Sequence, residues 1–243
     1  QSTWTWLQTT RAVVDSGGFM WYIDTLVSTG VFARGKKEID IDQFDARLAA
    51  AYGREEDKQQ QYDEWAASYD ADLVDDLDYV AWRDAGDIFA GLVEDRSLRV
   101  LDVACGTGLA GEYLRTLGYQ SLDGADFSHE MLALAEKRAV YDQLWQHDFT
   151  LAKDLEQRYD CLLCVGQFSF AVPKITDLHH VVNCVVPGGL CVITVNGAAW
   201  RQLSLEPEVY RQAQLHGFRV EQIVEAEYIR KQDIDARVLV IRR

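Results

Sequence analysis

The sequence has 243 residues and a net charge of −15, and 48% of its residues are hydrophobic, with seven tryptophans among them. This length and apolar content suffice for one sizeable core, whereas no apolar run reaches the ~20 residues that a membrane span needs. Because the acidic excess repels phosphate groups, the composition disfavours nucleic acids and anionic membrane surfaces as partners.

Location and redox state are predicted from the chain start and the cysteines. No signal-peptide pattern opens the sequence, and the five cysteines are an odd number in segments typical of core or loop. We therefore expect a cytoplasmic protein with reduced thiols. The first residue is Gln1 rather than Met, so a targeting segment upstream of it stays an open alternative.

Two regions with different patterns meet near residue 95. Residues 1–95 have helical spacing and few β-branched runs, and between Glu38 and Asp95 there are 18 acidic but only 4 basic residues. Residues 96–243 alternate short apolar runs with helical stretches, which is typical of a parallel α/β sheet. The sequence thus predicts an N-terminal helical cap over 1–95 and an α/β domain over 96–243.

Aromatic residues mark two stretches of the first region. Residues 4–32 are unusually aromatic for a leader, and Trp21 and Tyr22 are candidates for either a substrate wall or core. In YDEWAASYD, residues 62–70, three aromatic residues share one helical face by their spacing. They are Tyr62, Trp65 and Tyr69. That face predicts either a seam packed on the sheet or a cover over a ligand site.

The second region predicts a Rossmann-like α/β fold with seven strands. Five parallel strands are expected at 98–103, 119–126, 144–148, 159–165 and 190–195, with helices at 108–117, 129–139 and about 175–186 between them. Pro187-Gly188-Gly189 predicts a turn before the fifth strand. A helix over 206–216 ends at Gly217. Strands at 219–229 and 236–242 follow, and their connection is too short for a crossover helix, so they form an antiparallel hairpin.

The loop after the first predicted strand, LDVACGTGLAG at 101–111, contains a literal G-x-G-x-x-G, with Asp126 lying 20 residues after Gly106. As a string it fits a nicotinamide dinucleotide site, in which glycines and a helix N-terminus approach the pyrophosphate. In such folds the first glycine follows the strand almost directly. Here Gly106 comes four positions after Asp102, and the carboxylate of Asp102 would repel a pyrophosphate. A carboxylate there suits an ammonium group, and S-adenosylmethionine carries an ammonium, a sulfonium and no phosphate.

DVACGTG (102–108) resembles the first motif of class I S-adenosylmethionine-dependent methyltransferases, and GADFSHEML (124–132) resembles their second. The resemblance covers about residues 97–243, including the closing hairpin. Ala104 stands where the family usually has a glycine. The YDEWAASYD segment is similar to one that precedes the first motif in small-molecule methyltransferases of the Williams–Beuren-region-like and ubiquinone-biosynthesis-like groups, where it caps the donor.

The resemblance implies the donor site. Asp126 would chelate both ribose hydroxyls, and HDF (147–149) lies where the family places an acid near the adenine amino group. Open alternatives are a helix N-cap for Asp148 and plain core for Met131 and Phe149. The implied donor-binding residues are Tyr62, Trp65, Tyr69, Asp102, Ala104, Gly106, Gly108, Asp126, Phe127, Met131, His147, Asp148, Phe149 and Val165.

The acceptor side is less determined by the sequence. Because a sulfonium is a good leaving group, the task is in-line alignment in a dry site, and only a protonated nucleophile needs a general base. Catalytic candidates are His179, Arg201 and Tyr22, and Arg201 is either a partner for a substrate carboxylate or a surface residue. Substrate-pocket candidates are Trp21, Tyr22, Gln167, Phe168, Trp200 and Arg201. No metal is expected, since Cys161 and Cys164 point to opposite faces of a strand.

The sequence therefore predicts an enzyme that transfers a methyl group from S-adenosylmethionine to a small molecule bearing a thiol, thioether, hydroxyl or carbon acid. One alternative is an NAD-dependent oxidoreductase, against which Asp102 and the lack of any Tyr followed four residues later by Lys both count. The other is a non-catalytic module that keeps the fold and binds S-adenosylmethionine or a partner. Neither a nucleic-acid nor a membrane partner is expected.

Overall fold

The computed structural model describes residues 58–151, 155, 158–170 and 174–243. All of them belong to the unit Ile39–Arg243. The predictions for Trp21, Tyr22 and the rest of residues 1–57 lie outside the described residues. Within the described part, no helix has the length and apolarity needed to cross a bilayer.

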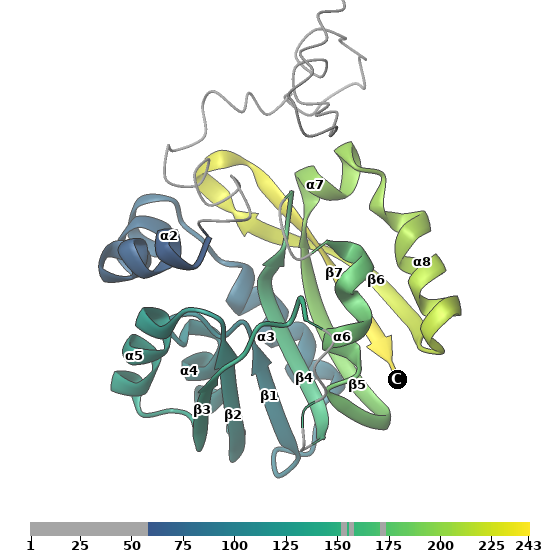
Figure 1. Cartoon of the computed structure of the whole chain (residues 1–243), viewed down its shortest axis with the longest axis horizontal. Coiled ribbons are helices and arrows are strands. Elements are labelled where there is room, and N and C mark those ends of the chain that lie inside the picture. The colour runs from purple at the N-terminus through teal and green to yellow at the C-terminus, as the bar shows by residue number, and fades with distance from the viewer. Residues whose placement is uncertain (1–57, 152–154, 156–157, 171–173) are drawn as a thin grey trace, which may run out of the picture. The chain divides into compact units, whose positions relative to one another are not determined.

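A seven-stranded sheet lies at the centre of the described unit, in the order β3-β2-β1-β4-β5-β7-β6 (Figure 1). The strands are β1 Arg99–Val103, β2 Ser121–Asp126, β3 Gln143–Gln146, β4 Tyr159–Phe168, β5 Val185–Asn196, β6 Arg219–Ile229 and β7 Ile234–Arg242. β1 to β5 pair in parallel, and β7 runs antiparallel to both β5 and β6. The predicted fold class is confirmed, including the C-terminal hairpin.

Helices cover both faces of this sheet. α3 (Ala81–Leu92) and α4 (Leu109–Thr116) share one apolar core, and α6 (Leu178–Val182) and α8 (Leu205–His216) share the other. Val100 of β1 packs in the first core, and Leu101 and Val103 pack in the second. Burial on both faces explains why the parallel strands read as nearly continuous apolar runs. Because β1 to β5 are parallel, all their carboxyl ends lie at one edge of the sheet.

The predicted helix over 175–186 is wrong at both ends. Residues Ile175–Asp177 form a 3₁₀ turn, and α6 ends at Val182. The pair Val185-Val186 begins β5 instead, because Val185 pairs with Tyr159 of β4. The predicted turn at Pro187-Gly188-Gly189 is an irregularity inside β5, where the pairing jumps from Tyr159↔Val185 to Cys161↔Leu190.

One short helix was not predicted. α7 (Gly197–Gln202) follows β5 directly, and the Asn196 side chain accepts hydrogen bonds from the Ala198 and Ala199 N–H groups at 3.0 Å. An asparagine in this position is a strong helix N-cap, so the strand passes into a helix without a loop. α8 ends at Gly217, whose φ of +73° confirms the predicted termination.

Candidate functional site

The glycine loop crosses the carboxyl end of β1 with three left-handed residues. Their φ angles are +55° at Ala104, +53° at Gly106 and +94° at Gly108. Glycine adopts this conformation freely, whereas a side chain makes it cost about 1–2 kcal/mol. The loop therefore favours glycine at position 104, which accounts for the glycine usually found there in the family that the sequence resembles.

We expect Ala104→Gly to change the free energy of unfolding by less than about 1 kcal/mol, because relief of strain and the entropy of glycine offset each other. Ala104→Val should destabilise the protein by about 2 kcal/mol, since a β-branched residue is strained at positive φ. Urea unfolding followed by tryptophan fluorescence measures both. Ala139 has a φ of +53° at the exposed end of α5 (His129–Arg138), so Ala139→Val is the control for the same strain outside the loop. Equal stability of Ala104→Val and the unmodified protein would contradict this account.

Asp126 is the last residue of β2, and its side chain hydrogen-bonds to the glycine loop. Its Oδ2 accepts a hydrogen bond from the Gly106 N–H and its Oδ1 accepts one from the Ser128 N–H, both at 2.9 Å. The side chain is buried, and this burial raises the pKa of Asp126 to about 6 although the backbone hydrogen bonds lower it. A buried carboxylate with two acceptor oxygens thus lies against the loop.

Asp102 lies in β1 between Gly124 of β2 and Leu163 of β4 and is 1% exposed. Its Oδ2 accepts a hydrogen bond from the Tyr141 hydroxyl at 2.7 Å, while its Oδ1 has no partner among the described residues. Burial raises the pKa of Asp102 to about 7. A buried carboxylate oxygen without a donor is costly, and a ligand ammonium would supply that donor.

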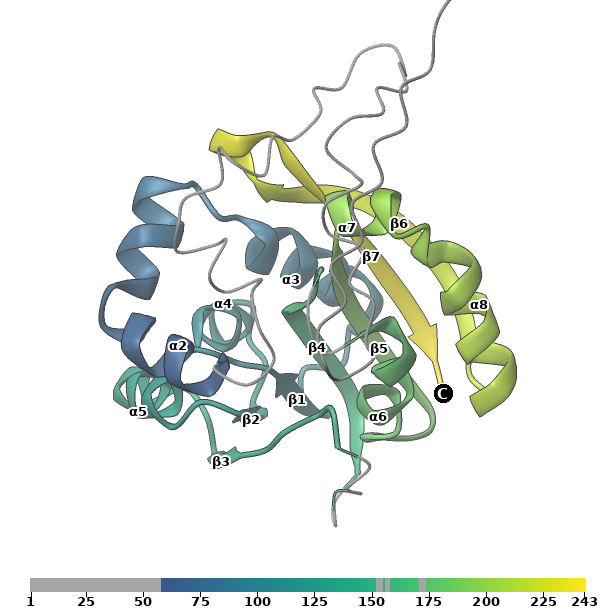
Figure 2. The same cartoon turned by 45° about the horizontal axis from the view of Figure 1, so that its top comes forward.

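The segment 58–76, which we call the cover segment, consists of α2 (Lys58–Trp65) and two irregular helical turns, Ala66–Ser68 and Ala71–Asp76. Figure 2 shows α2 next to α5. The predicted aromatic face is present: Tyr62 lies 5.4 Å from Phe127 and Trp65 lies 4.7 Å from Tyr69, between ring centroids. Burial, followed by the nearby charge of Asp126, raises the pKa of Tyr62 to about 12. The aromatic face thus lies beside Asp126.

Two aspartates that the sequence reasoning missed anchor the cover segment. Asp63 accepts a hydrogen bond from the Ser128 hydroxyl at 2.5 Å. Asp70 accepts one from the Thr107 hydroxyl at 2.5 Å and pairs with Arg138. The anchors therefore bind Ser128 of the second motif and Thr107 of the glycine loop. The signal was the repetition of Tyr-Asp at a spacing of seven, which puts both aspartates on one helical face.

A pair of tyrosines, also missed, lies over the carboxyl end of β4. Gly166 has a φ of +80°, and a Cβ there would be 3.0 Å from the Tyr79 hydroxyl and 3.7 Å from the Tyr228 hydroxyl. The two rings meet edge-on at 5.2 Å, and Tyr79 bridges to Ile229 of β6. Burial raises the pKa of Tyr228, so its hydroxyl stays neutral. Local sequence patterns give no sign of this pair.

The other residues predicted to bind the donor differ in their burial and in their contacts. The His147 N–H donates to the Asp126 carbonyl at 2.9 Å. Asp148 is exposed, and its Oδ1 accepts hydrogen bonds from the Thr150 N–H and hydroxyl, which caps a turn. Phe149 and Met131 are both buried, and Phe149 packs in the core beneath α6 and α8. Val165 is half-buried beside Tyr79.

The remaining acceptor-side candidates lie in several places. Phe168 and Trp200 pack in the core beneath α6 and α8, and Gln167 is half-buried at the end of β4. Arg201, on α7, pairs with Asp235 at 2.7 Å. The ring of His179 stacks at 3.9 Å on that of His216, at the end of α8. Arg201 thus contacts Asp235 and His179 contacts His216, and neither partner belongs to the glycine loop or the cover segment.

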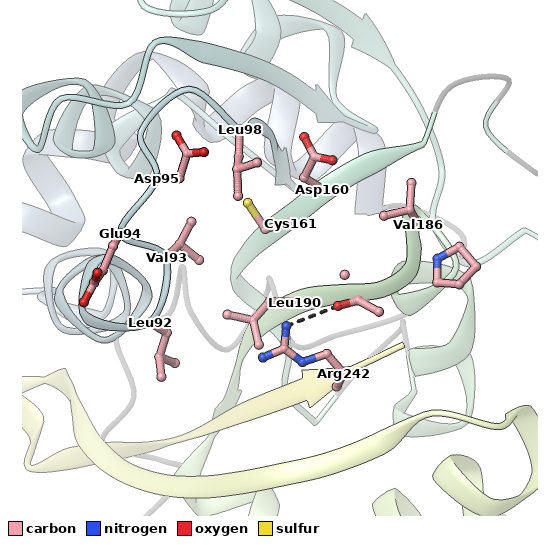
Figure 3. A pocket seen from close by; sticks show the side chains of 13 residues that line it. Leu92, Val93, Glu94, Asp95, Leu98, Asp160, Cys161, Val186, Leu190 and Arg242 are labelled. Atoms are coloured by element: carbon pink, nitrogen blue, oxygen red, sulfur yellow. Dashed lines mark hydrogen bonds between the residues drawn. The ribbon is translucent and has the colours of Figure 1, made fainter.

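A cavity of about 440 Å³ lies at the opposite edge of the sheet (Figure 3). Leu98, Asp160, Cys161 and Leu190 line it near the amino ends of the parallel strands, and Arg242 donates to the Gly188 carbonyl at 3.1 Å. Because Asp126 and the glycine loop are at carboxyl ends, this cavity is separate from the candidate site. Cys161 and Cys164 lie in different cores, and no described group of three His, Cys, Asp or Glu residues is arranged to hold a metal ion.

The sheet order, the glycine loop after β1 and the acid that ends β2 are features of the class I S-adenosylmethionine-dependent methyltransferase fold, and the cofactor of that class is S-adenosylmethionine. Residues 100–189 match the family described as a methyltransferase domain. The orphaned Asp102 Oδ1 and the Asp126 carboxylate fit the ammonium and the ribose hydroxyls of that cofactor.

The known proteins that this chain is similar to are also methyltransferases by name. The chain is 38% identical over 160 residues to human Methyltransferase-like protein 27, covering 61% of this chain and 62% of that protein. It is 30% identical over 111 residues to the ubiquinone biosynthesis O-methyltransferase of Bradyrhizobium diazoefficiens, covering 44% of each. The chain therefore spans less than two thirds of these relatives. A Haloferax volcanii protein solved with the Trm112 methyltransferase activator shares the fold, with a TM-score of 0.57 and 19% identity over 75% of this chain and 96% of that one.

Proposed function

We propose that this protein transfers the methyl group of S-adenosylmethionine to a small-molecule acceptor and releases S-adenosylhomocysteine. The observation that carries the proposal is the position of Asp126, which fixes the Gly106 N–H of the glycine loop and borders the aromatic face of the cover segment. Asp126 thus borders both parts of the proposed donor site, the glycine loop and the cover segment. The division into a cap over 1–95 and a catalytic domain over 96–243 is part of the proposal, as is a cytoplasmic location.

In this proposal two buried carboxylates hold the donor. Asp126 accepts from the ribose hydroxyls, for which a carboxylate is suited because it offers two oxygens at once. Asp102 accepts from the ammonium through Oδ1, the oxygen that has no partner within the described residues. Glycines at 106 and 108 let the ligand approach the backbone closely. His147, Asp148, Phe149, Phe127 and Met131 form the adenosine side of the proposed site, and Val165 flanks the donor where the substrate pocket begins.

Bound there, S-adenosylmethionine supplies an activated methyl group with a neutral leaving group. The chain itself has to align the acceptor and keep water out. Tyr62, Trp65 and Tyr69 suit both tasks, because packed aromatic rings exclude water and their faces attract a sulfonium. This role needs the cover segment to stay closed, which Asp63 and Asp70 favour.

The tyrosine pair over Gly166 supports the acceptor end of the proposal. Tyr79 and Tyr228 are buried and place their hydroxyls at the carboxyl ends of β4 and β6, where burial keeps the Tyr228 hydroxyl neutral. Neutral hydrogen-bonding groups among aromatic rings suit an uncharged small molecule that becomes largely enclosed. The similarity to a ubiquinone biosynthesis O-methyltransferase agrees with such an acceptor and with a hydroxyl nucleophile.

Calorimetry with S-adenosylhomocysteine and with NADH tests the proposal. We expect S-adenosylhomocysteine to bind and NADH to give no signal, because the buried Asp102 opposes a pyrophosphate. NADH binding without S-adenosylhomocysteine binding would overturn the proposal in favour of an oxidoreductase. Turnover of methyl-labelled S-adenosylmethionine is then measured over a panel of thiols, thioethers, phenols and carbon acids. Donor binding with no turnover on any of them would instead indicate a non-catalytic binding module.

A further inference from the structure

Tyr141, in the loop between α5 and β3, lies in a space that only glycines leave open. A Cβ added at Gly111 would be 2.2 Å from the Tyr141 hydroxyl oxygen, and one at Gly124 would be 2.9 Å from its ring. A Cβ at Gly108 would be 3.2 Å from the same ring. Gly108 and Gly111 both belong to the G-x-G-x-x-G string, so that string serves the tyrosine as well as the loop.

The Tyr141 hydroxyl reaches through this space to Asp102. It donates to Oδ2 at 2.7 Å and is the one side chain among the described residues that hydrogen-bonds to that carboxylate. Oδ1, on the same carboxylate, is buried and has no partner there. The two oxygens of Asp102 thus differ: one is held by the protein, and the other is left for a ligand.

We propose that Tyr141 is a positioning residue for the methyl donor: its phenol fixes Asp102 through Oδ2, so that Oδ1 is presented to the donor's ammonium group. This inference rests on the proposed function, because it assigns the ammonium to Asp102. It adds a residue that none of the sequence motifs contains. It also explains why Gly111 and Gly124, which lie beneath the loop, are glycines.

The charges around Asp102 agree with this role. Burial is the largest cause that raises the pKa of Asp102; the Tyr141 hydroxyl lowers it, Asp126 from β2 raises it, and the Gly111 N–H lowers it. The other titratable groups that face it are the thiols of Cys105, from the loop, and Cys164, from β4, and burial keeps both neutral. None of these groups is a cation. Within this set, Tyr141 is therefore the side chain that favours the ionised form of Asp102, whose pKa is about 7.

Calorimetry with S-adenosylhomocysteine between pH 6 and 8.5 tests the proposal on Tyr141→Phe. The ammonium prefers the ionised carboxylate, so affinity falls as the pH drops through the pKa of Asp102. Without the phenol that pKa rises, and the fall moves to higher pH. We expect about tenfold weaker binding at pH 7, with partial recovery at pH 8.5. The separate pH dependence caused by Asp126, near pH 6, should stay in place.

Two controls separate positioning from general destabilisation. Tyr113→Phe removes a hydroxyl that donates to the exposed Asp87 at 2.6 Å, and it should bind S-adenosylhomocysteine as the unmodified protein does. If Tyr141 acts through Asp102, adding Tyr141→Phe to Asp102→Asn changes the affinity by less than about twofold. Gly111→Ala, which displaces the phenol, should reproduce the pH shift.

The outcomes are distinct. Unchanged affinity and an unchanged pH midpoint in Tyr141→Phe would overturn the inference while leaving the proposed function intact. A full additive loss in the double variant with Asp102→Asn would overturn it as well, because Tyr141 would then act independently of that carboxylate. Failure of the unmodified protein to bind S-adenosylhomocysteine would refute the proposed function itself, and the inference with it.

Discussion

Replacing Asp126 by asparagine is expected to weaken S-adenosylhomocysteine binding at least about 100-fold, because each hydrogen bond to a charged acceptor is worth about 1.5–3 kcal/mol and two are proposed to the ribose. The fold should survive. Burial places the pKa of Asp126 in the folded chain, about 6, above its usual 3.8. Its contribution to stability is therefore present below that usual value and lost as the pH rises through 6. A neutral asparagine avoids this loss at pH 7.

Asp123→Asn is the matched control on the same strand. Asp123 is buried, accepts a hydrogen bond from the Tyr159 hydroxyl at 2.8 Å and pairs with Arg99 at 3.3 Å. It lies three positions before Asp126 in β2, so the two side chains face opposite sides of the sheet. This variant should lose about 1–2 kcal/mol of stability and bind the ligand normally. Equal binding by Asp126→Asn and Asp123→Asn would refute the role proposed for Asp126.

The sheet could be predicted because its signals are local. Apolar runs bounded by turn residues place β1, β2 and β4, and the short connection after Ile229 requires the antiparallel pair β6–β7. The limits of α6 and β5 could not be predicted in the same way. Val181-Val182 is helical and Val185-Val186 is extended, although the residues are the same, because pairing with β4 decides between them.

The residues of the candidate site also fall into those that local patterns predict and those that they do not. Asp102, Asp126 and the loop glycines stand in short motifs, so their positions follow from the sequence. Tyr141 meets Asp102 across 39 residues of sequence, and Tyr79 meets Tyr228 across 149. Contacts of that range depend on the sheet order and on which glycines leave room. Gly111 is an example, because the reason for a glycine there is the ring of Tyr141, which lies 30 residues further along the chain.

The cover segment is an intermediate case, and it leads to the second large expected effect. Its aromatic spacing was recognised, but its anchors, Asp63 and Asp70, were not. Asp70 is 40% exposed and its partner Arg138 is 20% exposed, so solvent screening limits that anchor to about 1 kcal/mol. With a similar contribution from Asp63, Asp63→Ala/Asp70→Ala should weaken S-adenosylhomocysteine binding by about 30-fold. The loss should appear mainly as faster dissociation in stopped-flow fluorescence, because the cover opens more often.

Asp75→Ala/Asp76→Ala removes the same charge from exposed positions of the same segment and is the control for net charge. It should leave both the dissociation rate and the protection of residues 58–76 from proteolysis unchanged. If the anchors act as we expect, ligand protects the cover segment of the unmodified protein but not that of the Asp63/Asp70 variant. Equal dissociation rates in the two double variants would mean that the aromatic contacts of Tyr62 and Phe127 alone keep the cover closed. Packing would then replace hydrogen bonding as the cause of closure.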